Sequence, residues 1–220
     1  MNKISNERKT QIKSVVLNLL KEYKNVYLPM PVKSIAKSLK NCRVIPYSTI
    51  LKNFNLSKSD IPKLFNSNDA CSDYDSNNDR YIIYYNDTDE SITDSNRYRW
   101  NIAHELGHIL LKHHQNENTR LFRNCLSQKE YSIFEYEANI FAAYLLVPHV
   151  ILYFQGVHSC SDIARLCKIS QSASQTRYSE YMYWLKNSKF VDKYDKEFKF
   201  YFTNPQKHKN KYSVCIVKLI

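Results

Sequence analysis

Two histidines four residues apart, His104 and His108, constrain the fold of this chain most strongly. Residues 97–112 contain no proline, and their apolar residues recur at helical spacing, which predicts an α-helix across the pair. Side chains at positions i and i+4 share one helix face, so both imidazoles can reach one metal ion. The motif is H-E-x-x-H, in which Glu105 can act on a water at that metal. The pattern predicts a zinc hydrolase, most often a peptidase.

The residues around the motif favour this helix over a coincidental pair of histidines. Ser95 or Asn96 can cap its beginning, because their side chains accept hydrogen bonds from free backbone N–H groups. Gly107 is unusual here, since glycine inside a helix costs about 1 kcal/mol relative to alanine. We therefore expect another backbone, or a substrate, to approach closely at this glycine.

A catalytic zinc site needs a third protein ligand and an open fourth position. Residues 134–148 predict a second helix that ends at Pro148. Glu135 and Asn139 share one face of it, so Glu135 can be the third ligand while Asn139 orients a ligand histidine. The alternative for Glu135 is a surface carboxylate. Glu137 lies about 200° around the helix from Glu135, so we predict that it is a solvated charge.

Together these two segments resemble the ImmA/IrrE family of zinc metallopeptidases. The first match is an alanine followed by H-E-L-G-H at 103–108, and the second is the run E-Y-E-A-N-I-F-A at 135–142 with its Leu-Leu-x-Pro end. The resemblance covers roughly residues 12–150 and extends weakly to about residue 187. It implies a zincin-like metallopeptidase fold and a protein substrate, because the family cleaves helix-turn-helix repressors.

The resemblance also implies a role for each candidate site residue. His104, His108 and Glu135 would ligate Zn²⁺, and Glu105 would be the catalytic base. For the group that stabilises the oxyanion, the sequence leaves several candidates open. They are His113, His114, Tyr136 and Tyr144.

The remaining patterns predict an α+β fold that is mainly helical with a small sheet. We expect helices over 10–23 and 32–39 and strands over 43–47 and 81–85, while residues 66–79 are polar and loop-like. The proline at position 46 places the first strand at a sheet edge. A strand beside the metal cleft could bind an extended peptide by adding it to its edge.

We expect three units, a metallopeptidase domain over 1–150, a helical segment over 151–187 and a C-terminal extension over 188–220. Two strands, 197–203 and 212–220, are expected in the extension. Between the two metal-bearing helices, the residues Leu121, Phe122 and Leu126 suggest a short helix or a flap over the cleft.

The segment from Ile163 to Ser170 resembles the first helix and turn of a helix-turn-helix unit. A plain helical hairpin is favoured, because Arg177 and Lys186 are the few basic side chains on the following helix. The net charge of +11 is spread along the chain, which favours a generally cationic surface over a dedicated nucleic-acid site.

Composition also bounds the location. The sequence has no run of about 18 apolar residues, so no membrane span is expected. The N-terminus lacks the apolar stretch of a signal peptide, and six cysteines form no C-x-x-C pair, so we expect free thiols in the cytoplasm.

The predicted function is an intracellular zinc endopeptidase that cuts a protein regulator. The alternative is a non-catalytic zinc-binding or DNA-associated regulator that sequesters a repressor.

Overall fold

The computed structural model of the chain describes residues 4–24, 26–94, 96–113 and 128–203. Within these residues, three strands form one mixed sheet in the order β1-β3-β2. The strands are β1 (Cys42–Pro46), β2 (Ala70–Asp75) and β3 (Arg80–Tyr85). β1 runs parallel to β3, and β2 runs antiparallel to it. The expected strand with a proline is therefore confirmed as an outer strand, with Pro46 as its last residue.

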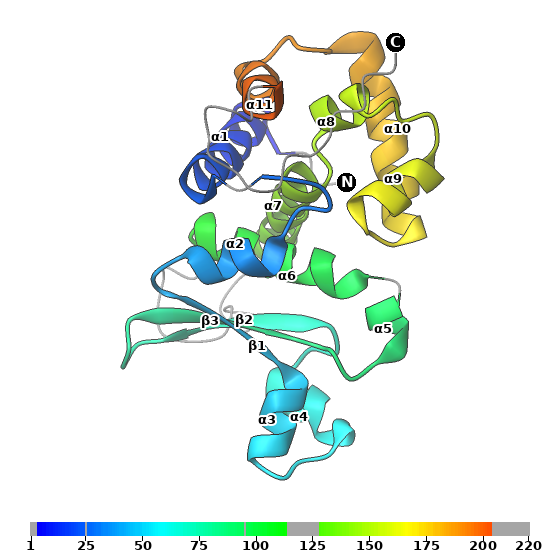
Figure 1. Cartoon of the computed structure of the whole chain (residues 1–220). Helices are drawn as coiled ribbons and strands as arrows, with labels where there is room; N and C mark the ends of the chain where they lie inside the picture. The colour runs from blue at the N-terminus through cyan, green and yellow to red at the C-terminus, as the bar shows by residue number, and fades with distance from the viewer. Residues whose placement is uncertain (1–3, 25, 95, 114–127, 204–220) are drawn as a thin grey trace.

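Helices cover both faces of this sheet (Figure 1). The helices on one face are α1 (Asn6–Tyr23), α2 (Val32–Ser38), α6 (Arg97–Leu110) and α7 (Gln128–Leu146). Those on the other face are α3 (Tyr47–Asn53) and α4 (Ile61–Phe65), with a short 3-10 turn at Lys58–Asp60 between them. The helix α5 (Glu90–Asp94) precedes α6. The last helices of the described part are α8 (His149–Phe154), α9 (Cys160–Cys167), α10 (Gln171–Asn187) and α11 (Lys193–Thr203). The predicted α+β, mainly helical fold is confirmed.

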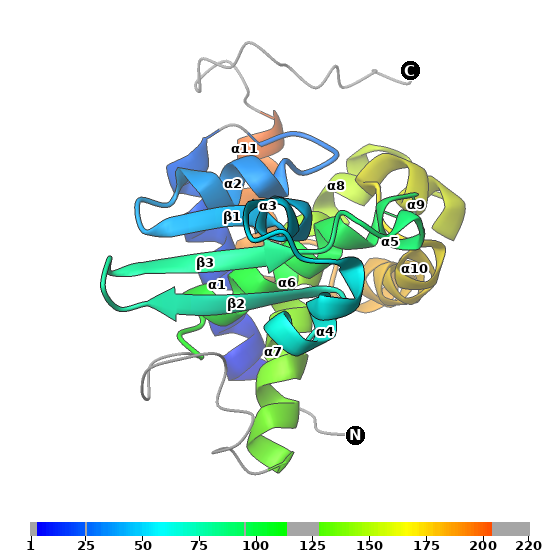
Figure 2. The same ribbon diagram turned by 90° about the horizontal axis from the view of Figure 1, so that it is seen from below.

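Alternation along the strands explains the two helical layers, because successive strand side chains point to opposite faces. Val44, Ala70 and Ile83 join the main core, which the larger group of helices completes. Cys71 and Tyr84 point the other way and pack on a second, smaller cluster made by α3 and α4. Figure 2 shows the sheet from the side of these two helices.

The prediction of a polar loop over 66–79 is wrong in part, because β2 occupies the middle of that segment. Its aspartates and serine disfavour a strand by composition. Pairing decides otherwise: Ser72 lies opposite Ile83, and β2 follows the apolar strand β3 along its whole length. The short polar run between β2 and β3 is the turn that joins them.

The strand expected over 197–203 is also wrong, because these residues belong to α11. The alternating aromatic residues have the period of a strand, but Tyr194 and Phe198 lie four apart and are both buried in the main core. Burial of that helical face outweighs the local alternation. The strand expected over 212–220 and the flap suggested for 121–126 lie outside the described residues.

The helical pair predicted after Pro148 is confirmed as α9 and α10. Its apolar side chains, such as Ile163 and Trp184, join the same main core as α1 and α6. Arg177 is buried and contacts Glu180 and His149, so it is not presented to a nucleic acid.

The segment Gln128–Phe154 is long and apolar enough to cross a membrane by length and composition alone. Inside the fold, 67% of the apolar window is buried. Burial of this extent is typical of the central helix of a soluble protein core, so the segment needs no membrane to explain it.

The close approach expected at Gly107 is confirmed. A Cβ built there would lie 3.1 Å from the Cβ of Phe141 and 3.2 Å from the Cα of Ala138, both on α7. The glycine therefore lets α6 and α7 come together.

We expect Gly107→Ala to lower stability by about 1 kcal/mol, because an overpacking cost of about 1–3 kcal/mol outweighs the gain of about 1 kcal/mol in helix propensity. Chemical denaturation measures this change. A more stable variant would contradict the tight packing.

Asp195 predicts a pH-dependent stability at the α11 end of the fold. Its carboxylate accepts a 2.6 Å hydrogen bond from the Trp184 indole and is 3% exposed. Burial raises the pKa of Asp195 from 3.8 to about 6, against the lowering effect of that bond. Because the folded-state pKa is the higher one, this carboxyl stabilises the fold below about pH 4, and the contribution is lost as the pH rises to about 6.

We therefore expect Asp195→Asn, which keeps an acceptor for Trp184, to raise stability at pH 7 by about 1–3 kcal/mol and to change little at pH 4. Urea unfolding at both pH values measures this, with exposed Asp94→Asn as the control. A loss of stability at pH 7 would refute the expectation.

Candidate metal centre

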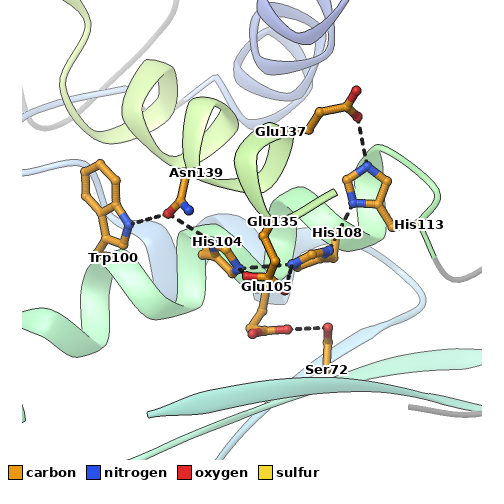
Figure 3. A network of polar contacts seen from close by, with 9 residues as sticks. All are labelled: Ser72, Trp100, His104, Glu105, His108, His113, Glu135, Glu137 and Asn139. Carbon is orange, nitrogen blue, oxygen red and sulfur yellow. Dashed lines mark hydrogen bonds and ion pairs between the residues drawn. The ribbon is translucent and has the colours of Figure 1, made fainter. Parts of the chain in front are cut away.

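The two histidines of the motif converge on one point at the centre of α6. Their Nε2 atoms lie 3.0 Å apart (Figure 3). His108 is fully buried and His104 is largely buried, with 15% of its side chain exposed. The helix itself is confirmed. Of the two predicted caps, Ser95 lies outside the described residues, and Asn96 does not act as one. Asn96 stands at the N-cap position with a φ of 58° and makes no side-chain capping bond.

Glu135 on α7 brings a carboxylate to the same point. Its oxygens lie 3.2 Å from Nε2 of His104 and 3.6 Å from Nε2 of His108. Among the described residues, these three form the group of side chains able to hold a metal ion. The surface alternative for Glu135 does not describe its position, because 30% of the side chain is exposed and both oxygens face the imidazoles.

The spacing and charge of this group fit a zinc ion. Bonds of about 2.0–2.1 Å in a tetrahedron separate ligand atoms by about 3.3–3.4 Å. The two Nε2 atoms lie 3.0 Å apart, and a different oxygen of Glu135 lies 3.2 Å from one and 3.6 Å from the other. Two imidazoles and one carboxylate are also a known catalytic zinc donor set. Burial lowers the pKa of His104, but the Glu135 and Glu105 carboxylates outweigh it and raise the pKa overall. The local field therefore favours a cation.

Asn139 lies behind His104, one helical turn after Glu135. Its Oδ1 is 3.2 Å from Nδ1 of His104 and accepts a 3.3 Å hydrogen bond from the indole of Trp100. With its Nδ1 hydrogen directed to this oxygen, His104 presents the lone pair of Nε2 to the metal position. Trp100 is a further contributor that the sequence analysis did not single out.

Behind His108 stands a third histidine, His113. Its Nδ1 lies 3.0 Å from Nδ1 of His108. Lys112 adopts a left-handed conformation with a φ of 62°, and the backbone N–H groups of His113 and Lys112 donate to the carbonyls of His108 and Ile109. This is a Schellman-type helix end, and it turns His113 back onto the motif.

Glu137 corrects the prediction of a solvated charge. Its side chain is 6% exposed, and it accepts two hydrogen bonds from Arg8 of α1, at 2.8 and 2.5 Å, and one of 3.0 Å from Nε2 of His113. Burial raises the pKa of Glu137, but these bonds outweigh it and lower the pKa to about 2. The helical spacing correctly separated it from the face of Glu135. The opposite face is covered by α1 and His113 rather than by water.

Glu105 is 7% exposed and points from α6 toward the sheet. One of its carboxylate oxygens accepts a 2.5 Å hydrogen bond from the hydroxyl of Ser72 on β2. The motif glutamate is thereby restrained beside the histidines (Figure 3). Ser72 was missed because its strand has the composition of a loop.

The structure narrows the candidates for stabilising an oxyanion. Both ring nitrogens of His113 are engaged behind His108. Tyr144 lies against Lys13 and Tyr194, two residues of α1 and α11. Tyr136, next to Glu135 and 37% exposed, remains as a candidate, while His114 lies outside the described residues.

Only some of the residues that contact the candidate ligands could have been predicted from the sequence. His113 follows the motif at a helix end, where a basic residue is common. Arg8 lies 129 residues before Glu137, and no local pattern connects them. The partners of the candidate ligands therefore come from α1, α6, α7 and the turn after α6.

Comparison with known proteins agrees with this geometry. The family model described as the IrrE N-terminal-like domain, a peptidase family, matches residues 61–177, which is more than half of the chain. The match contains α6 and α7 with all three members of the metal-binding group, and it excludes α1. No curated protein matches this chain. The chain belongs to the ImmA/IrrE family of metallopeptidases.

Proposed function

We propose that this protein is a zinc-dependent endopeptidase that hydrolyses a peptide bond in a protein regulator. The observation that carries the proposal is the convergence of His104, His108 and Glu135 with a restrained Glu105 beside them. A binding site alone would need the three ligands but no buried carboxylate next to them.

The residues divide the chemistry between them. A zinc ion held by His104, His108 and Glu135 would polarise the scissile carbonyl and acidify a water. Glu105 would accept the proton of the attacking water and deliver it to the leaving amine. The hydrogen bond from Ser72 limits the rotation of the Glu105 carboxylate.

The sheet supports binding of an extended substrate. β2 is an outer strand in the order β1-β3-β2, and its residue Ser72 contacts Glu105. A peptide that adds to the outer edge of β2 would lie alongside the catalytic glutamate, with its backbone paired to the strand. Such pairing binds any extended sequence, so specificity must come from side-chain contacts.

The substrate class follows from the resemblance to the family, whose members cleave helix-turn-helix repressors. We propose such a repressor as the substrate and test it directly. A helix-turn-helix protein encoded next to this chain is incubated with the purified protein, with zinc or after removal of zinc by a chelator. We expect two fragments with zinc, identified by mass spectrometry, and none without it.

The same experiment separates the alternative function. A non-catalytic regulator would bind the repressor without cleaving it, and a DNA-associated one would bind DNA with a salt-dependent affinity that does not need zinc. A stable uncleaved complex at full zinc occupancy would refute the peptidase proposal for that substrate.

A further inference from the structure

We propose that α1 supports the metal centre. Arg8 on α1 acts through Glu137 and His113, and these three are positioning residues for the ligand His108. Metal binding and the docking of α1 then stabilise each other. This inference rests on the proposed zinc site but not on the proposed peptidase activity. It assigns a role to a helix that lies outside the matched segment 61–177.

The contacts form one continuous chain from α1 to the metal position. The Nε and one Nη of Arg8 donate to the two carboxylate oxygens of Glu137, at 2.8 and 2.5 Å. Glu137 is 3.0 Å from Nε2 of His113, whose Nδ1 is 3.0 Å from Nδ1 of His108. No water is needed to complete the chain, because each step is a direct contact.

Only one assignment of hydrogens satisfies this chain while His108 binds a metal. Arg8 has donors only, and the ionised Glu137 accepts only, so Nε2 of His113 must donate to Glu137. The Nδ1 of a neutral His113 is then an acceptor, and His108 must donate to it from its own Nδ1. This tautomer leaves the lone pair of His108 Nε2 directed at the metal position.

The side chains that link Arg8 to His108 are buried. The side chains of His108, His113 and Glu137 are 0%, 2% and 6% exposed. The ring of His113 also stacks on Phe134, with 4.3 Å between the ring centroids. The Glu137 side chain is only 6% exposed, so loss of Arg8 would leave its carboxylate short of donors. The carboxylate and His113 would then shift, and His108 with them.

The coupling is reciprocal. If the docked position of Arg8 increases the affinity for zinc, then bound zinc must increase the stability of the docked α1 by the same factor. α1 also makes ion pairs that do not reach the site, among them Lys21 with Glu197 at 2.5 Å on α11. These pairs offer a matched control, because they attach the same helix without touching the metal centre.

The first test measures the zinc dissociation constant of the full chain by competition with a chromophoric chelator. We expect Arg8→Met to weaken zinc binding about 10–100-fold, the range for lost outer partners of ligands. Arg8→Lys keeps the charge but not the bidentate contact, so its zinc affinity should lie between those of the wild type and Arg8→Met. Lys21→Met should stay within about twofold of the wild type, since that pair lies outside the metal site. Equal affinities for wild type and Arg8→Met would overturn the inference.

A second measurement separates positioning from general loosening of the fold. Arg8→Met is combined with His113→Leu, which removes the link between Glu137 and His108. We expect no further loss of zinc affinity in the double variant, because Arg8 acts through His113. Additive losses of zinc affinity would show that Arg8 acts through packing. They would overturn the inference that it acts through Glu137 and His113. His113→Asn, which can keep an acceptor near His108, should recover part of the affinity lost in His113→Leu.

Hydrogen exchange tests the reciprocal effect without any activity assay. Zinc should slow exchange of the backbone amides of α1 in the wild type and have little effect on them in His113→Leu. Protection of α1 that is the same with and without zinc would contradict the coupling. If the protein cleaves no repressor but shows these effects, the proposed function fails and this inference stands. If the wild type binds no zinc, both fail.

Discussion

Replacing Glu105 by glutamine should lower peptide hydrolysis by about 10²–10⁴-fold while zinc binding stays close to that of the wild type. The amide keeps the size of the side chain and an oxygen that can accept from Ser72, but it cannot take the proton of the attacking water. Initial rates on a cleaved repressor and a zinc titration of the same samples measure the two quantities.

A matched control is Glu22→Gln, the same change at an exposed position of α1. It should leave both the rate and the zinc affinity unchanged. Equal cleavage by the wild type and Glu105→Gln would show that another group moves the proton, and the role assigned to Glu105 would then be wrong.

Replacing Glu135 or Glu137 by alanine should mainly change different properties. For Glu135 this is the affinity for zinc, and for Glu137 it is the stability of the metal-free protein. Glu135→Ala should weaken zinc binding by more than the roughly 10–100-fold cost of losing an outer partner, because it removes a ligand. It should leave the stability of the metal-free protein almost unchanged, since it does not leave a buried charge without its partner.

Glu137→Ala should instead destabilise the metal-free protein by about 2–3 kcal/mol. This is less than the 3–5 kcal/mol typical when a buried pair is broken, because Arg8 is one-third exposed and water can reach it. Chelator competition and urea unfolding in the presence of EDTA measure these two effects. If Glu137→Ala cost more zinc affinity than Glu135→Ala, the assignment of the third ligand would be reversed.

The candidate site was predictable where it depends on positions along a single helix. The spacing of His104 and His108 determines that their side chains share a face of α6. The same spacing joins Glu135 to Asn139 on α7, and both pairs lie at the predicted place. Gly107 was informative for a related reason, because its cost within a helix implied a neighbour that needs the space.

Prediction failed where the outcome depends on what lies across from a residue. Periodicity showed that Glu137 points away from Glu135, but it could not show that α1 covers that side. The same limit explains β2, whose polar residues become a strand by pairing with β3. It also explains α11, whose Tyr194 and Phe198 form a helical face because a core is there to receive them.

By itself, the sequence determined the motif helix, the likeness to a peptidase family and the faces that carry the candidate ligands, because helical geometry relates residues only a few positions apart. The tertiary structure alone decided that the two helices bring their candidate ligands together, that Ser72 restrains Glu105, and that Arg8 reaches Glu137 from 129 residues away. Those contacts arise when the apolar faces of α1, α6 and α7 are buried together. That burial also brings polar side chains into contact, and no local sequence pattern predicts which ones.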